Sequence, residues 1–294
     1  MANPRKSDRR AFQPSLDGVL EPRLLLSKAK LSLPTYPQVI IQSGAGGMLS
    51  RVILPNGEPF EITTARGTVQ AIANKKTGHI DIIIRGSTED TEVAINPISR
   101  YIAKGVAHDF AYGDANRSGM MQVGNITVTS GTLGAFVGYN TAVLNGSLNI
   151  PSSNRVDRIA FQALAPGASI TTGGDLEDLD IRQNANLVGQ SSFIHVGRDL
   201  NWFNMPGDLN LTNGATLAIG RYVGETFQPN RGSGPAGQGI QIGGNLNIGP
   251  GSSFTVGNSL VGNVVINGLT TGASRISVAN QGIGGFFFQG GFTP

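Results

Sequence analysis

The sequence predicts an all-β protein, a right-handed parallel β-helix or β-solenoid built from short strands and Gly/Asn turns. Glycine supplies 42 of the 294 residues and charged residues only 14%, a composition that favours many turns between short strands. Apolar and polar residues alternate over several short segments, which is the pattern of strands with one buried face. A short motif also recurs from about residue 118 onward, as stacked coils require.

The alternation is clearest before the repeats begin. Ile80, Ile82 and Ile84 are two residues apart, so they should share the buried face of one strand. Two apolar runs flank Asn56-Gly57, a strong hairpin signal. We therefore expect residues 48–117 to form a β-rich leading region or the first coils. Within them, residues 96–113 are compatible with either a short helix or a loop.

Residues 118–294 carry the repeats. The recurrent kernel is a glycine, then Asp or Asn, then Leu, followed by a Gly/Ser turn and an alternating apolar pair. The kernel leucines are Leu148, Leu176, Leu200 and Leu246, with spacings of 28, 24 and twice 23 residues. In a solenoid of this period, alternate apolar residues point inward and stack, while Gly and Asn occupy the corners. The length and period predict about eight coils.

Several features modify this simple scheme. A β-sandwich with regular strand spacing is the alternative fold class. Residues 222–239 interrupt the repeats, and we expect them to form a loop that leaves the stack. Residues 284–294 contain four Phe. Because the terminal coils of a solenoid need covering, we expect a C-terminal aromatic cap, with an exposed apolar tail as the alternative.

The net positive charge of the chain comes from its first 30 residues. Residues 1–30 hold seven Lys or Arg and three Asp or Glu, whereas the remaining residues hold 15 and 16. A nucleic-acid-binding domain carries its basic residues on the folded part, so we expect no nucleic-acid partner. No apolar run reaches the roughly 18 residues that span a bilayer. The absence of cysteine excludes disulfides, zinc ribbons and thiol nucleophiles.

Residues 1–47 are basic and rich in proline, so we expect a largely disordered sorting or linker segment. Its stretch SLDGVLEPRLLLS, residues 15–27, has too short an apolar run for an ordinary signal peptide. It resembles the LEPR-xLL type N-terminal region of exported planctomycete surface proteins. The matching residues are Leu20, Glu21, Pro22, Arg23, Leu25, Leu26 and Ser27. The resemblance implies a sorting element followed by an extracellular, β-rich, adhesin-like sequence, and it carries no activity.

The densest acidic cluster is DLEDLDIR, residues 175–182. On a strand, Asp178, Asp180 and Arg182 share one face, and paired carboxylates in such a row suit the acid–base cleavage of glycans. Asp175, Glu177 and Asp178 are candidate oxygen ligands for calcium, the one cofactor that this pattern suggests. The alternative is a solvated corner with its own salt bridge.

The single tryptophan, Trp202, adjoins Phe203. Neighbouring strand residues face opposite sides, so one ring should lie in the core and the other should be available to stack on a sugar. The three histidines, His79, His108 and His195, have no metal-binding spacing. No nucleophile elbow is present.

These features predict a non-catalytic, exported surface or extracellular-matrix protein with an adhesin-like structural or binding role. Its expected partners are glycans or other surface and matrix proteins, and its expected location is extracellular or on the cell surface. Two alternatives stay open. One is a polysaccharide lyase or hydrolase on a parallel β-helix, and the other is a structural subunit that polymerises end to end through uncapped coils.

Overall fold

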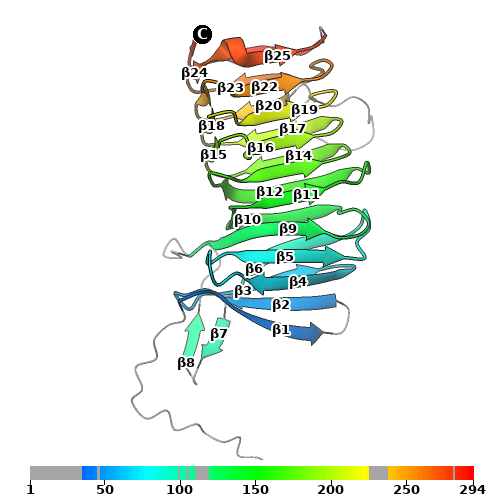
Figure 1. Ribbon diagram of the computed structural model, residues 1–294, viewed down its shortest axis with the longest axis vertical. Helices are drawn as coiled ribbons and strands as arrows, with labels where there is room; N and C mark the ends of the chain where they lie inside the picture. The colour runs from blue at the N-terminus through cyan, green and yellow to red at the C-terminus, as the bar shows by residue number, and fades with distance from the viewer. Residues whose placement is uncertain are drawn as a thin grey trace, which may run out of the picture. The chain divides into compact units, whose positions relative to one another are not determined.

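In a computed structural model, the chain is described over residues 35–44, 47–98, 100–103, 106–109, 119–224, 238–280 and 282–294. This part is an all-β parallel β-solenoid of about 7 turns (Figure 1), which confirms the predicted fold class. The described residues contain no α-helix and a single 3₁₀ turn, η1 (Ala273–Arg275). The predicted right-handed sense of the coils stays a prediction.

The first strands of the solenoid are antiparallel. They are β1 (Gln38–Gly44), β2 (Gly47–Ile53), β3 (Pro59–Thr64), β4 (Thr68–Ala73), β5 (Ile80–Arg85) and β6 (Glu92–Pro97). β1 pairs with β2, β2 with β3, β3 with β6, and β4 with β5. The β2–β3 hairpin turns at Gly57, whose φ of 88° suits glycine. Ile80, Ile82 and Ile84 are fully buried, as their alternation predicts.

The described residues within 96–113 contain strands in place of the short helix or the loop that the sequence left open. β7 (Arg100–Ala103) and β8 (Val106–Asp109) pair antiparallel as a separate two-stranded sheet. Ile102 and Val106, whose spacing of four suggested a helix, lie on the two strands of this hairpin. There the backbone hydrogen bonds run between strands, so the helical spacing has no structural meaning.

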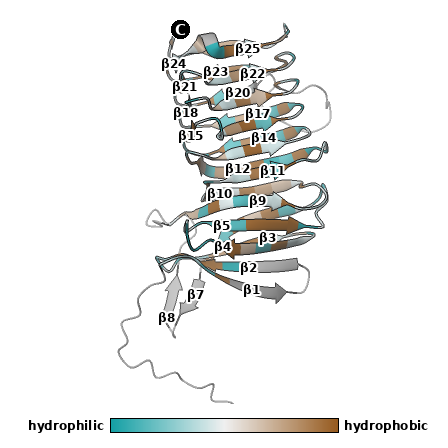
Figure 2. Cartoon of the chain, in the orientation of Figure 1, coloured by the Kyte–Doolittle hydropathy of each residue, from teal (hydrophilic) through white to brown (hydrophobic). Residues whose placement is uncertain are grey.

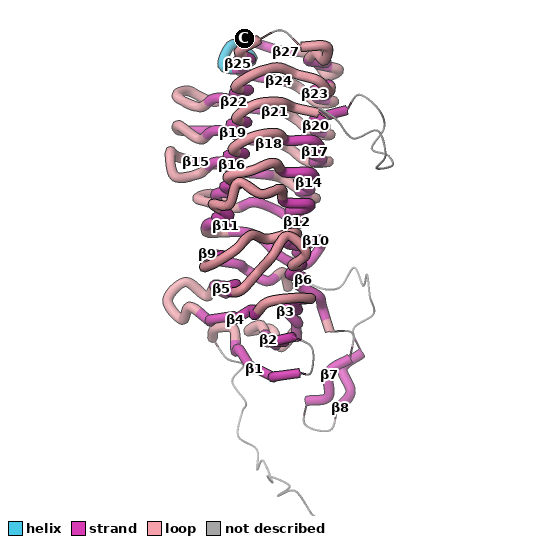
Figure 3. Tube along the Cα trace, turned by 90° about the vertical axis from the view of Figure 1, so that its right-hand side faces the viewer, coloured by secondary structure: helices cyan, strands magenta, loops and turns pink. Residues whose placement is uncertain are grey.

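Each coil of the parallel stack has three faces (Figure 3). Face A holds β10 (Ala135–Leu144), β12 (Val156–Leu164), β14 (Leu176–Ile181), β17 (Leu200–Met205), β20 (Gln238–Ile242), β23 (Asn263–Ile266) and β26 (Phe286–Phe288). Face B holds the ends of β10 and β12, then β15 (Ala185–Val188), β18 (Leu209–Thr212), β21 (Leu246–Ile248), β24 (Thr270–Thr271) and β27 (Phe292–Thr293). Face C holds β9 (Met121–Val128), β11 (Ser147–Ile150), β13 (Ser169–Thr172), β16 (Phe193–Val196), β19 (Thr216–Ile219), β22 (Ser253–Val256) and β25 (Ile276–Val278).

Inward side chains stack into continuous ladders through the core. On face A, one register position of successive coils is filled by fully buried Phe136, Ile159, Leu179, Phe203, Ile240 and Val264. Figure 2 shows hydrophobic and hydrophilic residues alternating along the strands that carry such ladders. Removal of this apolar surface from water is the dominant favourable contribution to folding.

The regular spacing of the repeat kernel suggested that its leucine always has the same position in the coil. In the structure the kernel leucines lie on different faces. Leu176 and Leu200 are register partners on face A, but Leu148 lies on face C and Leu246 on face B. Leu246 is the partner of Leu209, so the expected two units of 23 residues are wrong. A single coil spans 37 residues there. The extra length includes residues 225–237, which lie outside the described residues.

The Asp or Asn of the kernel lies at the corner where the chain turns onto a face. Its side chain accepts a hydrogen bond from a backbone N–H of the next coil. Asn184 accepts from Asp208 (2.9 Å), Asp208 from Asn245 (2.7 Å) and Asn245 from Leu269 (2.8 Å). Each corner thus satisfies a backbone donor that no strand partner reaches. This explains why Asp or Asn precedes Leu in the motif.

A second corner, at the end of face C, is occupied by stacked glycines. An added Cβ on Gly220 would lie 2.1 Å from the backbone oxygen of Gly197, and one on Gly257 would lie 2.2 Å from that of Gly220. Gly220 also donates its N–H to Val196 at 2.8 Å. Successive coils therefore approach each other at this corner more closely than any side chain allows.

The four C-terminal Phe extend the stack by one more coil. β26 pairs parallel with β23, and β27 pairs with β24. Phe286 and Phe288 pack against the core cluster, while Phe287 and Phe292 remain 50% and 60% exposed. The aromatic residues are thus strand residues of the last described coil.

Candidate functional site

The outer side of face A brings together Asp178, Asp180 and Trp202, three of the residues that the sequence singled out. Arg158, Asp178 and Trp202 are register partners on β12, β14 and β17. On the same side, Asp180 is the partner of Asn204. Side chains from three coils therefore form one outward-facing cluster of charged, aromatic and amide groups.

Asp180 is held by an ion pair within this cluster. Its carboxylate accepts a hydrogen bond from the guanidinium of Arg158 on the preceding coil, and its side chain is only 10% exposed. The Arg158 guanidinium also lies 5.5 Å from the centre of the Tyr139 ring. This Arg links its own coil to both neighbouring coils, because it contacts the Asp180 carboxylate of the following coil and the Tyr139 ring of the preceding one.

Asp178 differs from its neighbour. It makes no ion pair or hydrogen bond through its side chain among the described residues, and it is half-buried. Burial raises the pKa of the Asp178 carboxyl, and the negative charges of Asp180 and Glu177 add to the effect. Arg158 and Arg155 act in the opposite direction. Asp178 therefore holds a proton more readily than an ordinary aspartate.

The raised pKa predicts a pH-dependent gain from replacing Asp178 with Asn. A carboxyl whose pKa is higher in the folded state than its ordinary 3.8 costs stability as the pH rises from that value through the folded-state pKa. Asp178→Asn removes this cost, so the variant should melt above the wild type at pH 7. At pH 3, where both states are protonated, the difference should largely vanish.

Thermal unfolding of both proteins at the two pH values measures this effect. Asp90→Asn is the matched control, because Asp90 is 61% exposed and its exposed ion pair with Arg66 contributes little to stability. An equal gain at pH 3 and pH 7 for Asp178→Asn would contradict the assignment.

Ion pairs with arginines of neighbouring segments occupy two of the three calcium candidates. Asp175 lies 3.4 Å from both Arg198 and Arg221. Glu177 lies 3.0 Å from Arg155 and accepts a hydrogen bond from Asn201 at 2.8 Å. Among the described residues, no three His, Asp or Glu side chains form a group that could hold a metal ion. The geometry of these carboxylates is that of coil-to-coil clamps.

Arg182, the third catalytic candidate, lies just after β14 and stacks on the Tyr139 ring, with its guanidinium 3.6 Å from the ring centre. Within the described part of the chain, no carboxylate pairs with it. Sequence reasoning missed Tyr139 and Arg158, since both lie one or two coils away from the acidic cluster. Only an alignment of coil with coil would have found them.

Trp202 and Phe203 face opposite sides of β17, as predicted. Phe203 is fully buried, whereas Trp202 is half-buried on the outer side. The three histidines lie on separate elements. His79 precedes β5, His108 belongs to β8, and His195 lies on the outer side of face C between Thr171 and Ala218.

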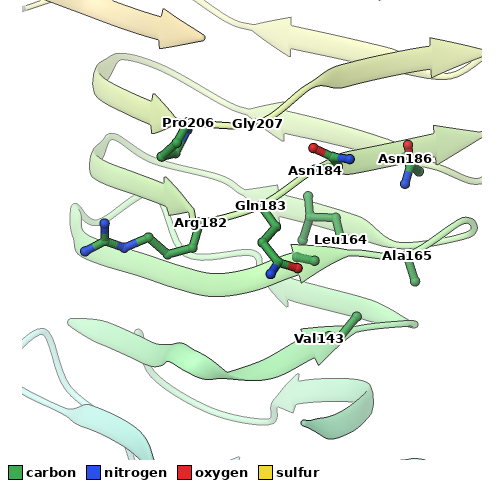
Figure 4. Close-up of a pocket in the computed structure, with 10 residues that line it drawn as sticks. Val143, Leu164, Ala165, Arg182, Gln183, Asn184, Asn186, Pro206 and Gly207 are labelled. Carbon is green, nitrogen blue, oxygen red and sulfur yellow. The ribbon is translucent and has the colours of Figure 1, made fainter. Parts of the chain in front are cut away.

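A cavity of about 620 Å³ opens at the corner between faces A and B (Figure 4). Its apolar lining includes Val143, Leu164 and Pro206. Its polar lining consists of Arg182 and the amide side chains Gln183, Asn184 and Asn186. The cavity therefore joins Arg182 to a row of amides that the sequence did not point to.

No family model, no curated protein and no solved structure matches the chain. The chain is a β-solenoid that these comparisons assign to no family. The residues that resemble the LEPR-xLL region, Leu20 to Ser27, lie outside the described residues. No helix in the described part of the chain is long and apolar enough to cross a membrane.

Proposed function

We propose that this chain is an exported, non-catalytic component of the cell surface or extracellular matrix, with an adhesin-like role in which face A binds glycans. The observation that carries the proposal is the ion pair between Arg158 and Asp180. A hydrolase that acts with two carboxyl groups needs both of them available to the substrate. Here one of the two candidates is committed to holding neighbouring coils together.

The aromatic groups of the same face support glycan binding. Trp202 is half-buried with its ring on the outer side, and its register partner is Asp178. An aromatic face packs against the apolar C–H face of a sugar ring, while nearby carboxyl and amide groups bond to hydroxyls. Trp202, Asp178 and Asn204 provide this combination on adjacent strands.

Two sequence features support export. Residues 20–27 resemble a sorting region of exported surface proteins, and the net positive charge comes from the first 30 residues. Fractionation of the producing cells, with mass spectrometry of the N-terminus, tests this part. We expect the protein outside the cytoplasm with the N-terminal segment removed, and an intact Met1 in the cytoplasmic fraction would contradict export.

Binding of the purified full chain to immobilised polysaccharides tests the role of face A. Trp202→Ala should lower the affinity about tenfold, a loss that corresponds to one aromatic packing contact. The matched control is Phe193→Ala, which removes a half-buried ring from face C and should leave binding unchanged. Equal losses in both variants would contradict the assignment of the binding face.

The enzyme alternative is tested in the same samples. Asp178, with its raised pKa, is the one candidate that suits a general acid. Release of new reducing ends or unsaturated products, lost in Asp178→Asn, would overturn the non-catalytic proposal. Polysaccharide that is bound but recovered at its original length supports it.

A further inference from the structure

We infer that the corner cavity binds the carboxylate or sulfate groups of an acidic polysaccharide, with Arg182 as the anion-binding residue. This inference rests on the proposed glycan-binding function and adds a second site with a defined charge preference. The cavity lies beyond the end of β14, on the corner that leads from face A to face B (Figure 4).

Arg182 is the arginine of these coils that is available to a ligand. In the described part of the chain, the other four, Arg155, Arg158, Arg198 and Arg221, are paired with carboxylates. Arg182 instead lies 3.6 Å above the centre of the Tyr139 ring. Stacking fixes the guanidinium plane but leaves its in-plane N–H groups free. These are the groups that bind a carboxylate or sulfate with two parallel hydrogen bonds.

A ladder of asparagines ends at the same cavity with an unused donor. Asn247 donates through its side-chain amide to Asn210 (2.6 Å), and Asn210 donates to Asn186 (2.7 Å). In both pairs the side-chain Nδ2 donates to the side-chain Oδ1 of the asparagine on the preceding coil. The Nδ2 of Asn186 has no such partner among the described residues, because the preceding coil aligns Leu164 with Ala185 and so offers Ala165 at this position.

The alanine also accounts for the cavity itself. Where later coils carry Asn210 and Asn247, the coil of β12 carries the small side chain of Ala165, which lines the hollow. The side-chain oxygen of Asn184 is likewise occupied by the N–H of Asp208, which leaves its Nδ2 as the group that can donate to a ligand. The ten lining residues include one cation and no acid. The site therefore offers donors to an acceptor-rich, negatively charged ligand.

The geometry favours an extended polysaccharide over other anions. Arg182 and Asn186 lie at opposite sides of the cavity (Figure 4), so a ligand that contacts both must extend across it. Val143 and Pro206 add exposed or half-buried apolar surface to the lining, suited to the C–H faces of sugars. A nucleic acid would need several neighbouring cations, whereas Arg182 is the one cation of the cavity lining. One cation with several amides suits one carboxylate or sulfate group together with the hydroxyls of the sugars beside it.

The test compares alginate with the same polymer after reduction of its carboxylates to alcohols. We expect the full chain to bind alginate at least about tenfold more tightly than the reduced polymer. Arg182→Gln should remove this preference while binding to the reduced polymer persists. Arg85→Gln, at an exposed arginine of β5 that lies off the cavity, is the matched control and should keep the preference.

Asn186→Asp is a second, independent variant. The aspartate keeps an oxygen that accepts the hydrogen bond from Asn210, so the ladder is preserved, but it replaces the free donor with a negative charge. We expect it to lose alginate binding about tenfold or more while its melting temperature stays close to that of the wild type. Unchanged alginate binding in both cavity variants would overturn the inference.

The remaining outcomes separate this inference from the proposed function. Equal binding to alginate and to the reduced polymer, lost in Trp202→Ala, overturns the acidic-ligand site and leaves glycan binding by face A intact. Binding to neither polymer contradicts both. Binding to RNA or to an acidic peptide that is lost in Arg182→Gln, with no polysaccharide bound, overturns the inference in favour of that ligand class.

Discussion

Replacing Phe203 with Ala is expected to lower the free energy of unfolding by about 3–5 kcal/mol. The ring is fully buried in the face A ladder, between Leu179 on one coil and Ile240 on the next. Both neighbours belong to strands whose positions are fixed by backbone pairing, so they cannot collapse into the space that the ring leaves. The cost therefore includes the lost transfer of apolar surface and most of a cavity.

Denaturant unfolding followed by circular dichroism measures this loss. Phe193→Ala serves as the control, because the same ring is removed from a half-buried, outward position and should cost less than half as much. Losses of similar size would show that Phe203 is not an inward ladder residue.

Gly220→Ala is expected to destabilise the protein by about 1–3 kcal/mol, the range of overpacked sites. Its new Cβ would lie 2.1 Å from the backbone oxygen of Gly197. Since the obstacle is backbone and not the end of a side chain, relief requires the two coils to separate. Separation would lengthen the hydrogen bond from the N–H of Gly220 to Val196, now 2.8 Å.

Gly249→Ala is the matched control for this substitution. Gly249 is also a corner residue of the stack, but its nearest obstacle is a methyl group of Thr212 at 3.4 Å. A single methyl should be accommodated there, with a change in unfolding free energy below about 1 kcal/mol. Comparable losses in the two variants would contradict a specific close approach at Gly220.

The strand pattern and the solenoid class could be predicted from the sequence, because both depend on neighbours along the chain. The alternation of Ile80, Ile82 and Ile84 holds whatever the rest of the fold does. The coil register could not be predicted. The kernel recurs on all three faces, with Leu148, Leu176 and Leu246 each on a different one, so its spacing does not measure coil length.

The candidate site also has a part that could be predicted from the sequence and a part that could not. Asp178, Asp180 and Trp202 were found in the sequence as a cluster and a lone aromatic residue, but their meeting depends on the pairing of β14 with β17. Arg158, which takes Asp180 out of consideration as a free acid, is 22 residues away in the chain. The free donor of Asn186 depends on three coils at once and leaves no local signal.

The hydrogen bonds at the Asp and Asn corners also bear on how such a chain changes length over generations. Asp175 precedes Leu176 just as Asp199 precedes Leu200, and the two leucines are register partners. Loss of the 24 codons for residues 176–199 would join Asp175 directly to Leu200, with every later side chain still on its own face. Loss of eight codons would shift every later residue by about one third of a coil, so that the side chains of the buried ladders would no longer all point inward. We therefore expect duplications and deletions to be tolerated when they add or remove whole coils, so the length of the stack should change by one coil at a time.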